Sequence, residues 1–346
     1  MPARPCDPSR PTVYLDWSSF EYAFNSRVLP SSDQGNGMAG LFALVEEIAT
    51  HANLVFSQLH LSELAAWGDV AAAREAAAWL DGLPLVWARF WPHVQVSEDN
   101  YWVKTIVGCS SLEPLRVFAP SMLATLEALS ADQTAEVLRT PTLVALFELE
   151  RTGGAFAAGI AREALKLAEL FHHDRRAVVE REATPKEIAA LKESAAYRHR
   201  VLLRQRALDA HKRLMVSDAD YAAKSPSLND VIDPFVTAFQ KEPTALPLAK
   251  VFDRLADGFI DTAARRKPES RRFGNLDSSV VDIFHALTGA AYCSIFTCDQ
   301  LTAGWLGDVR PKLGLPQPVV FAKDEAGFVA DLRQAWHGAR SAPEPV

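Results

Sequence analysis

The chain lacks the features of several large protein classes, and each absence narrows what it can do. None of its 346 residues belongs to an uninterrupted apolar run of the roughly 20 residues that span a bilayer, so we expect no membrane partner. The four cysteines form no close CxxC pair and match no zinc spacing. The first 11 residues are proline-rich and have no apolar signal core, and a reduced, cytoplasmic setting is the expectation.

Basic charge and glycine-rich phosphate loops are also scarce. The formal net charge of −7 does not favour nucleic-acid binding, although a local basic surface can still dominate its own neighbourhood. Gly153-Gly154 and Gly35-x-Gly37 lack the lysine and the flanking strand of a phosphate-binding loop. The sequence therefore gives no support to a nucleoside triphosphate enzyme.

Alternating strand and helix patterns occur at both ends of the chain. Strands are predicted at 12–15, 53–57, 294–297 and 319–321, and helices at 17–27, 40–51, 70–80, 278–291 and 325–337. The residues between are almost wholly helical in pattern, including a charged helix at 187–213 and one or two helices at 229–261 that Pro234, Pro243 and Pro247 should break. This order predicts an α/β/α sandwich with a parallel sheet.

The predicted organisation has three parts. Residues 1–11 form a flexible leader, residues 12–80 and 275–340 form the α/β core, and residues 81–274 form a mainly helical insertion. An insertion of that size inside a core made from both chain ends would shape access to any site on the sheet.

Four acidic residues stand in contexts that could deliver them to one site. Asp16 follows the apolar run 13–15, Glu63 lies on the helix after the second strand, and Asp299 closes the strand near the C-terminus. Asp282 lies on the helix before that strand. Since parallel strands end at the same edge of a sheet, these carboxylates should meet there, with Asp16 on the central strand as the bridging ligand. Taken singly, an aspartate after a strand is more often a turn former or a helix N-cap.

Neighbouring polar residues could support these acids. Asp277 is the main rival to Asp282, and its place before two serines favours an N-cap or a supporting role. Ser57 and Thr297 could orient carboxylates by hydrogen bonding. His285, one turn after Asp282, could touch a substrate, although a histidine on a helix face is more often structural.

Together these contexts resemble a PIN-like nuclease domain. The similarity lies in a hydrophobic strand ending at Asp16, in the segment from Ser57 to Leu64, and most specifically in the path from Asp282 to Thr297-Cys298-Asp299. It covers about residues 12–80 and 275–325. The resemblance implies that Asp16, Glu63, Asp282 and Asp299 bind Mg²⁺ or Mn²⁺ and carry the catalysis, with RNA as the usual substrate and DNA as the alternative.

Two basic clusters could supply the phosphate-binding surface of such an enzyme. Arg265, Arg266, Lys267, Arg271 and Arg272 precede Asp282 in the chain, which favours a nucleic-acid contact, and the alternative is a solvated loop. The other cluster, between residues 198 and 213, is interleaved with acids and reads as an ordinary charged helix face.

The expected function is therefore a metal-dependent ribonuclease, a hydrolase of phosphodiester bonds. Two divalent cations can activate water and stabilise both the attacking and the leaving oxygen. The alternative is a PIN-like fold kept as a non-catalytic protein- or RNA-binding scaffold, with a protein partner or inhibitor docked on the helices. A phosphatase with Asp16 as nucleophile is disfavoured, because Ser18 stands where a second aspartate is generally needed.

Overall fold

A mostly parallel sheet forms the centre of the molecule. The computed structural model describes residues 6–28, 40–119, 142–154, 184–265, 274–321 and 325–341. Within them, six strands pair in the order β4-β3-β2-β1-β5-β6. Their bounds are β1 (Thr12–Tyr14), β2 (Asn53–Phe56), β3 (Val86–Ala88), β4 (Phe118–Ala119), β5 (Ile295–Asp299) and β6 (Val319–Phe321). Only the pairing of β3 with β4 is antiparallel, so the chain has the predicted α/β class with a mostly parallel sheet.

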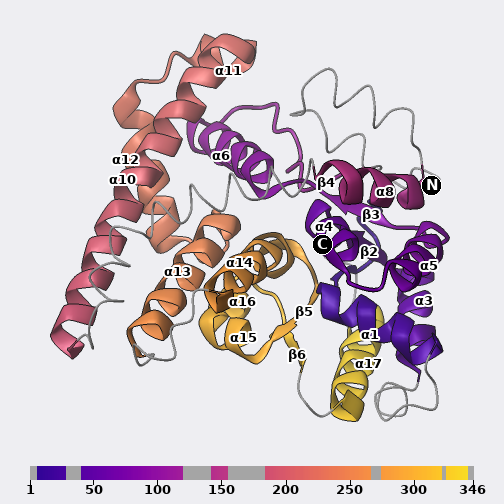
Figure 1. The fold of residues 1–346 in the computed structure, drawn as a ribbon. Helices are drawn as coiled ribbons and strands as arrows, with labels where there is room; N and C mark the ends of the chain where they lie inside the picture. The colour runs from indigo at the N-terminus through magenta and orange to yellow at the C-terminus, as the bar shows by residue number, and fades with distance from the viewer. Residues whose placement is uncertain are drawn as a thin grey trace.

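Helices cover both faces of this sheet (Figure 1). Val13 packs with α1 (Trp17–Val28), α3 (Leu41–His51) and α17 (Glu325–Ser341), whereas Tyr14 packs with α13 (Pro247–Arg265) and α14 (Gly274–Tyr292). Successive side chains of a strand point to opposite faces, which accounts for this division. The remaining helices near the sheet are α4 (Gln58–Ala66), α5 (Val70–Asp81), α8 (Leu143–Gly153), α15 (Gln300–Leu306) and α16 (Val309–Lys312).

The sheet extends further into the chain than the sequence indicates. β3 and β4 lie within 81–274, the range predicted to be mainly helical, and β3 joins the sheet by pairing Val55 with Val86 and Phe56 with Trp87. The four predicted strands are present as β1, β2, β5 and β6. The chain therefore returns to the core after α5 before it leaves for the long helices.

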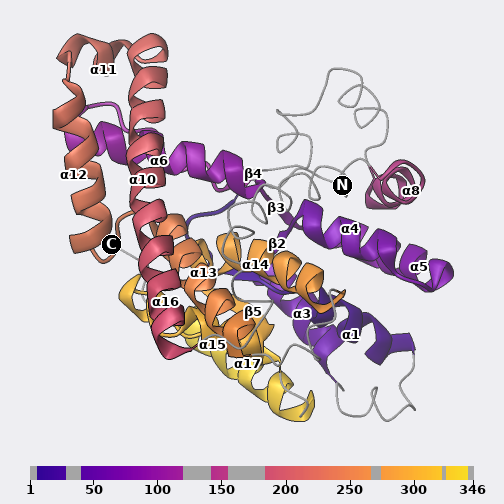
Figure 2. The ribbon, with the colours of Figure 1, turned by 60° about the vertical axis from the view of Figure 1, so that its left-hand side comes forward.

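A helical extension projects to one side of the sheet (Figures 1 and 2). It consists of α6 (Trp91–Val107), α10 (Pro185–Ser217), α11 (Ala219–Lys224) and α12 (Leu228–Lys241), which share a separate apolar core. The predicted break at Pro234 is wrong, because this residue lies inside α12. Val231 and Phe235 are fully buried on that helix, and their packing outweighs the cost of the proline.

A buried ionic network ties the extension to the core. We call Glu98 and Asp99, both on α6 and both buried, the α6 acidic pair. Arg206 on α10 donates from Nη2 to Asp99 Oδ1 at 2.6 Å and to Glu98 Oε2 at 3.3 Å. Glu98 Oε1 also accepts from the Tyr292 hydroxyl at 2.6 Å and from the Leu248 backbone N–H at 2.8 Å. Four helices therefore meet at one hydrogen-bonded network of two carboxylates and one guanidinium.

The junction of α14 with β5 is fixed by a fully buried arginine. Arg310 donates to the backbone carbonyls of Gly289 and Cys293, at 3.2 and 3.0 Å, and also to those of Ala290, Ser294 and Pro316. These bonds satisfy carbonyls that the end of a helix leaves open, where a positive charge is also favoured. Gly289 itself lies so close to the sheet that a Cβ there would stand 2.4 Å from the Phe296 ring. Helix α14 is thus held at a set distance from β5.

The chain ends add two further observations. Residues 1–5 of the predicted leader lie outside the described residues, whereas Asp7 accepts and donates backbone hydrogen bonds with the Asn53 side chain. Among the described residues, no helix combines the length and the apolar character needed to cross a membrane.

Candidate active site

Four carboxylates gather at the carboxyl edge of the parallel strands. Asp16 follows β1 and Asp299 is the last residue of β5, which pairs directly with β1. Glu63 comes from α4, the helix after β2, and Asp282 comes from α14. We call these four residues the sheet-edge carboxylates. The charges of Asp299, Glu63 and Asp16 all act on Asp282, so the structure brings the four predicted acids into one neighbourhood.

Asp16 is oriented by two hydroxyl groups. Its Oδ1 accepts from Ser19 Oγ at 2.5 Å and from Thr297 Oγ1 at 2.9 Å. Thr297 in turn accepts from the Asp16 backbone N–H at 2.8 Å, so the hydroxyl joins β1 to β5 at this point. Thr297 makes the contact predicted of it, and Asp16 Oδ2 receives no hydrogen bond from the described residues. Burial raises the pKa of Asp16, against the effect of the two hydroxyl groups.

Glu63 is held by a buried histidine. His285 Nε2 stands 2.7 Å from Glu63 Oε2, and because a carboxylate only accepts, this nitrogen carries the proton. The other ring nitrogen, Nδ1, is 2.7 Å from the hydroxyl of Tyr14. Burial alone would lower the pKa of His285, but the charges of Glu63, Asp16 and Asp282 raise it. The acids around His285 therefore favour its protonated form, which would partly balance the charge of the site.

Behind His285 lies a second buried polar layer. The Tyr14 hydroxyl is 3.2 Å from Ser57 Oγ, which is 2.9 Å from His60 Nδ1. His60 Nε2 donates to the Leu15 carbonyl at 2.7 Å, and burial keeps the pKa of this imidazole well below its usual value. Ser57 was predicted to orient a carboxylate directly. Its described contacts are instead with Tyr14 and His60, where it is also the N-cap of α4.

The surroundings of Asp282 disfavour its charged form. Burial, followed by the charge of Asp299, raises its pKa to about 7. Within the described residues it receives no hydrogen bond, whereas Asp299 accepts one from the Thr302 backbone N–H at 2.7 Å and so caps α15. Asp299 is thus a helix N-cap, the structural role that the sequence allows. This role uses only one of its two carboxylate oxygens.

The site has an excess of negative charge over positive charge. In the described part of the chain, no lysine or arginine is hydrogen-bonded or ion-paired to any of the sheet-edge carboxylates. Nor does any group of three or more His, Cys, Asp or Glu side chains there have an arrangement that could hold a metal ion as it stands. The donor set is nevertheless chemically suited to Mg²⁺ or Mn²⁺, which prefer carboxylate oxygens.

The chain was compared with protein-family models, with curated proteins and with solved structures. None of them matches. The argument for function therefore rests on the geometry of the site.

Some predicted site residues fall outside this geometry. Arg266, Lys267, Arg271 and Arg272 lie outside the described residues, and Arg265 is the last residue of α13. The prediction that Asp277 precedes a helix as its N-cap is wrong, because α14 begins at Gly274 and includes Asp277.

The structure also adds residues that the sequence did not reveal. Ser19 and Tyr14 both belong to the site, and the charge of Glu63 helps to raise the pKa of Glu21 on α1, after the larger effect of burial. His285, for which the sequence leaves a substrate contact and a structural role open, is hydrogen-bonded to Glu63 and Tyr14. Its spacing of three residues from Asp282 indicates only a shared helix face, and its contact with Glu63 on another helix leaves no signal in the sequence.

Proposed function

We propose that the chain is a metal-dependent nuclease that hydrolyses phosphodiester bonds, with RNA as substrate and a PIN-like α/β core. The observation that carries the proposal is the gathering of four carboxylates at one edge of a parallel sheet without a matching lysine or arginine among the described residues. Like charges held close together raise one another's pKa, so such a cluster is favourable chiefly when a cation joins it.

Asp16, Glu63, Asp282 and Asp299 would hold Mg²⁺ or Mn²⁺ at this edge. Bound there, the ion would supply an activated water and would stabilise the charge that develops on the phosphate oxygens. Thr297 and Ser19 fix the direction of Asp16, and His285 fixes that of Glu63. Such contacts to ligating groups typically account for 10- to 100-fold in metal affinity or activity, roughly 1.4 to 2.7 kcal/mol.

The test is cleavage of labelled single-stranded RNA and DNA in the presence of Mn²⁺, Mg²⁺ or EDTA. We expect cation-dependent cleavage of RNA by the wild type, and a loss of at least about a thousandfold in Asp16→Asn and Asp299→Asn, roughly 4 kcal/mol in activation free energy. Asp233→Asn is the matched control, because this exposed aspartate pairs with Arg204 on the helical extension.

Either of two results would contradict the proposal. Full activity in Asp16→Asn would show that the sheet-edge carboxylates are not the active site. RNA binding by a wild type that cleaves neither substrate with any cation would instead favour the non-catalytic scaffold.

A further inference from the structure

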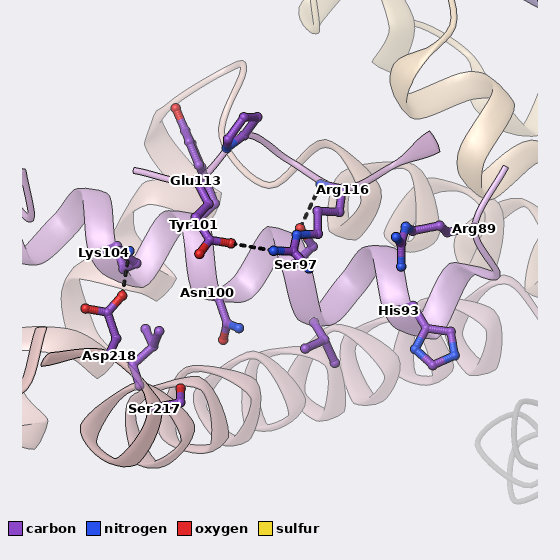
Figure 3. A pocket seen from close by; sticks show the side chains of 13 residues that line it. Arg89, His93, Ser97, Asn100, Tyr101, Lys104, Glu113, Arg116, Ser217 and Asp218 are labelled. Carbon is purple, nitrogen blue, oxygen red and sulfur yellow. Dashed lines mark hydrogen bonds and ion pairs between the residues drawn. The ribbon is translucent and has the colours of Figure 1, made fainter. Parts of the chain in front are cut away.

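A second feature of interest is a cavity of about 300 Å³ along α6. It lies between that helix, the segment leading to β4 and the C-terminal end of α10 (Figure 3). The polar residues that line it include Arg89, His93, Ser97, Lys104, Arg116 and Asp218. A cavity of this size is at the lower end of the range for small-ligand sites, which fits one nucleotide and excludes a duplex.

The lining of this cavity has the opposite sign to the whole chain. Arg89, Lys104 and Arg116 are permanent cations, and the acids are Glu113 and Asp218. Each acid is already matched, since Glu113 Oε2 is 3.0 Å from Arg116 Nη2 and Asp218 Oδ2 is 2.6 Å from Lys104 Nζ. A cavity with a cationic excess in a protein of net charge −7 is suited to an anionic ligand.

The two ion pairs differ in their ability to exchange partners. The Lys104–Asp218 pair is largely buried and forms part of the wall (Figure 3). The side chains of Arg116 and Glu113 are 59% and 70% exposed, so their pair contributes little and a phosphate could replace the carboxylate. The Arg116 backbone N–H donates to Ser97 Oγ at 2.9 Å, which keeps this segment against α6.

Arg89 connects the cavity to the sheet-edge carboxylates. It directly follows β3, two strands from β1, which corresponds to a separation of about 10 Å along the carboxyl edge. Arg89 also lines a second, very small cavity that Tyr14 and Ser57 border. The guanidinium therefore stands between the hydrogen-bonded layer behind Glu63 and the larger cavity.

We propose that the α6 cavity binds one nucleotide of a single-stranded substrate, a short distance along the strand from the bond that is cut. Arg89 and Arg116 bind its phosphate, and the rings of His93 and Tyr101 offer faces on which a base can stack. This inference rests on the proposed nuclease function, since it names the form of nucleic acid that the same site takes.

The experiment measures binding without cleavage. Fluorescence anisotropy of labelled single-stranded RNA, and of a duplex of the same sequence, is followed over a salt series with the full chain carrying Asp16→Asn. We expect Arg89→Gln together with Arg116→Gln to weaken single-strand binding at least tenfold. The double variant should also reduce the slope of log K against log salt by about 1.4, since each lost contact with a single strand changes it by about 0.7.

Two controls keep the result specific. Arg340→Gln removes an exposed cation that pairs with Glu47 on α3, near the opposite edge of the sheet, and should leave binding unchanged. Arg116→Gln alone changes an exposed side chain and should weaken binding severalfold even if the half-buried Arg89 proves necessary for folding.

The outcomes separate this inference from the proposed function. The wild type could cleave RNA while Arg116→Gln and the double variant bind it as tightly as the parent does. That result would overturn the proposed nucleotide site and leave the proposed nuclease function standing. Equal affinity for duplex and single strand would also overturn it. Binding that the cavity variants weaken, in a wild type that never cleaves, would support the cavity and count against the nuclease.

Discussion

Two groups of acids in this protein differ in how their negative charge is compensated. The α6 acidic pair accepts hydrogen bonds from the Arg206 guanidinium, from a tyrosine hydroxyl and from a backbone N–H. Among the described residues, no lysine or arginine is paired with the sheet-edge carboxylates, and His285 is the basic side chain hydrogen-bonded to one of them. The α6 acidic pair therefore has its hydrogen-bond partners within the fold. The sheet-edge carboxylates require a cation that the described residues do not supply.

The comparison shows how burial can serve either stability or function. Burial raises the pKa of Glu98, and the Arg206 charge opposes that increase. Burial also raises the pKa of Asp282, but the next contribution, from Asp299, raises it further. A charge that is expensive to bury remains in a fold either because a partner compensates it or because a ligand does.

Removing Arg206 should have the largest effect on stability. We expect Arg206→Met to lower the free energy of unfolding by about 3 to 5 kcal/mol, because two buried carboxylates lose their cation. Urea-induced unfolding measures the loss. Arg204→Met is the control, since its exposed pair with Asp233 should contribute less than about 1 kcal/mol. Equal losses in the two variants would show that the α6 acidic pair does not depend on Arg206.

A divalent cation should stabilise the protein by binding to the sheet-edge carboxylates and not to the α6 acidic pair. Mn²⁺ at about 100 times its dissociation constant should raise the free energy of unfolding by about 2.7 kcal/mol, and EDTA should reverse the gain. Thermal melting of the wild type and of Asp16→Asn provides the measurement. The gain should vanish in Asp16→Asn and persist in Asp233→Asn, so a response retained by both would place the cation elsewhere.

Neutralising Asp282 should stabilise the cation-free protein. Because its pKa is raised to about 7, the folded state keeps a proton that the unfolded state loses above about pH 4. The contribution of Asp282 to wild-type stability should therefore fall as pH rises from about 4 to about 7, with a slope of at most about 1.4 kcal/mol per pH unit. In EDTA at pH 8, we expect Asp282→Asn to be about 2 kcal/mol more stable than the wild type, and the difference should disappear near pH 4. A variant less stable than the wild type at pH 8 would refute this account.

The smallest expected effect on stability comes from one hydroxyl group that donates to the α6 acidic pair. Tyr292→Phe removes the donor 2.6 Å from Glu98 and should cost about 1.5 kcal/mol. The thermal shift with Mn²⁺ should stay at the wild-type value. A reduced shift would mean that the two acidic groups are coupled through α14, the helix that contacts both.

The sequence predicted the parts of the fold with a clear hydrophobic pattern. Strands β1, β2, β5 and β6 follow apolar runs bounded by polar or turn residues. β3 contains only three residues, one of them Trp87, which are too few to show a period, and β4 contains two. The break predicted at Pro234 failed because local propensity is weaker than the burial of Val231 and Phe235.

The candidate site was foreseen in its acids and not in its supporting residues. Asp16 and Asp299 end adjacent parallel strands, so topology alone brings them together. The contacts of His285 and of Tyr14 depend on how α14 sits on the sheet, which is set by Gly289 and Arg310 rather than by any local motif. Roles that arise from the distance between two elements leave no trace in the spacing of residues along either one.

The pairing of β1 with β5 joins residues near the start of the chain to residues near position 299. During synthesis, Asp16 and Glu63 leave the ribosome long before Asp282 and Asp299 exist, so a nascent chain cannot assemble the four acids. Contacts this distant in sequence also form late and slowly. For a protein proposed to cut RNA, that order of events would spare the message and the ribosome that are producing it. A chain truncated before β5 should accordingly neither bind Mn²⁺ nor cleave RNA.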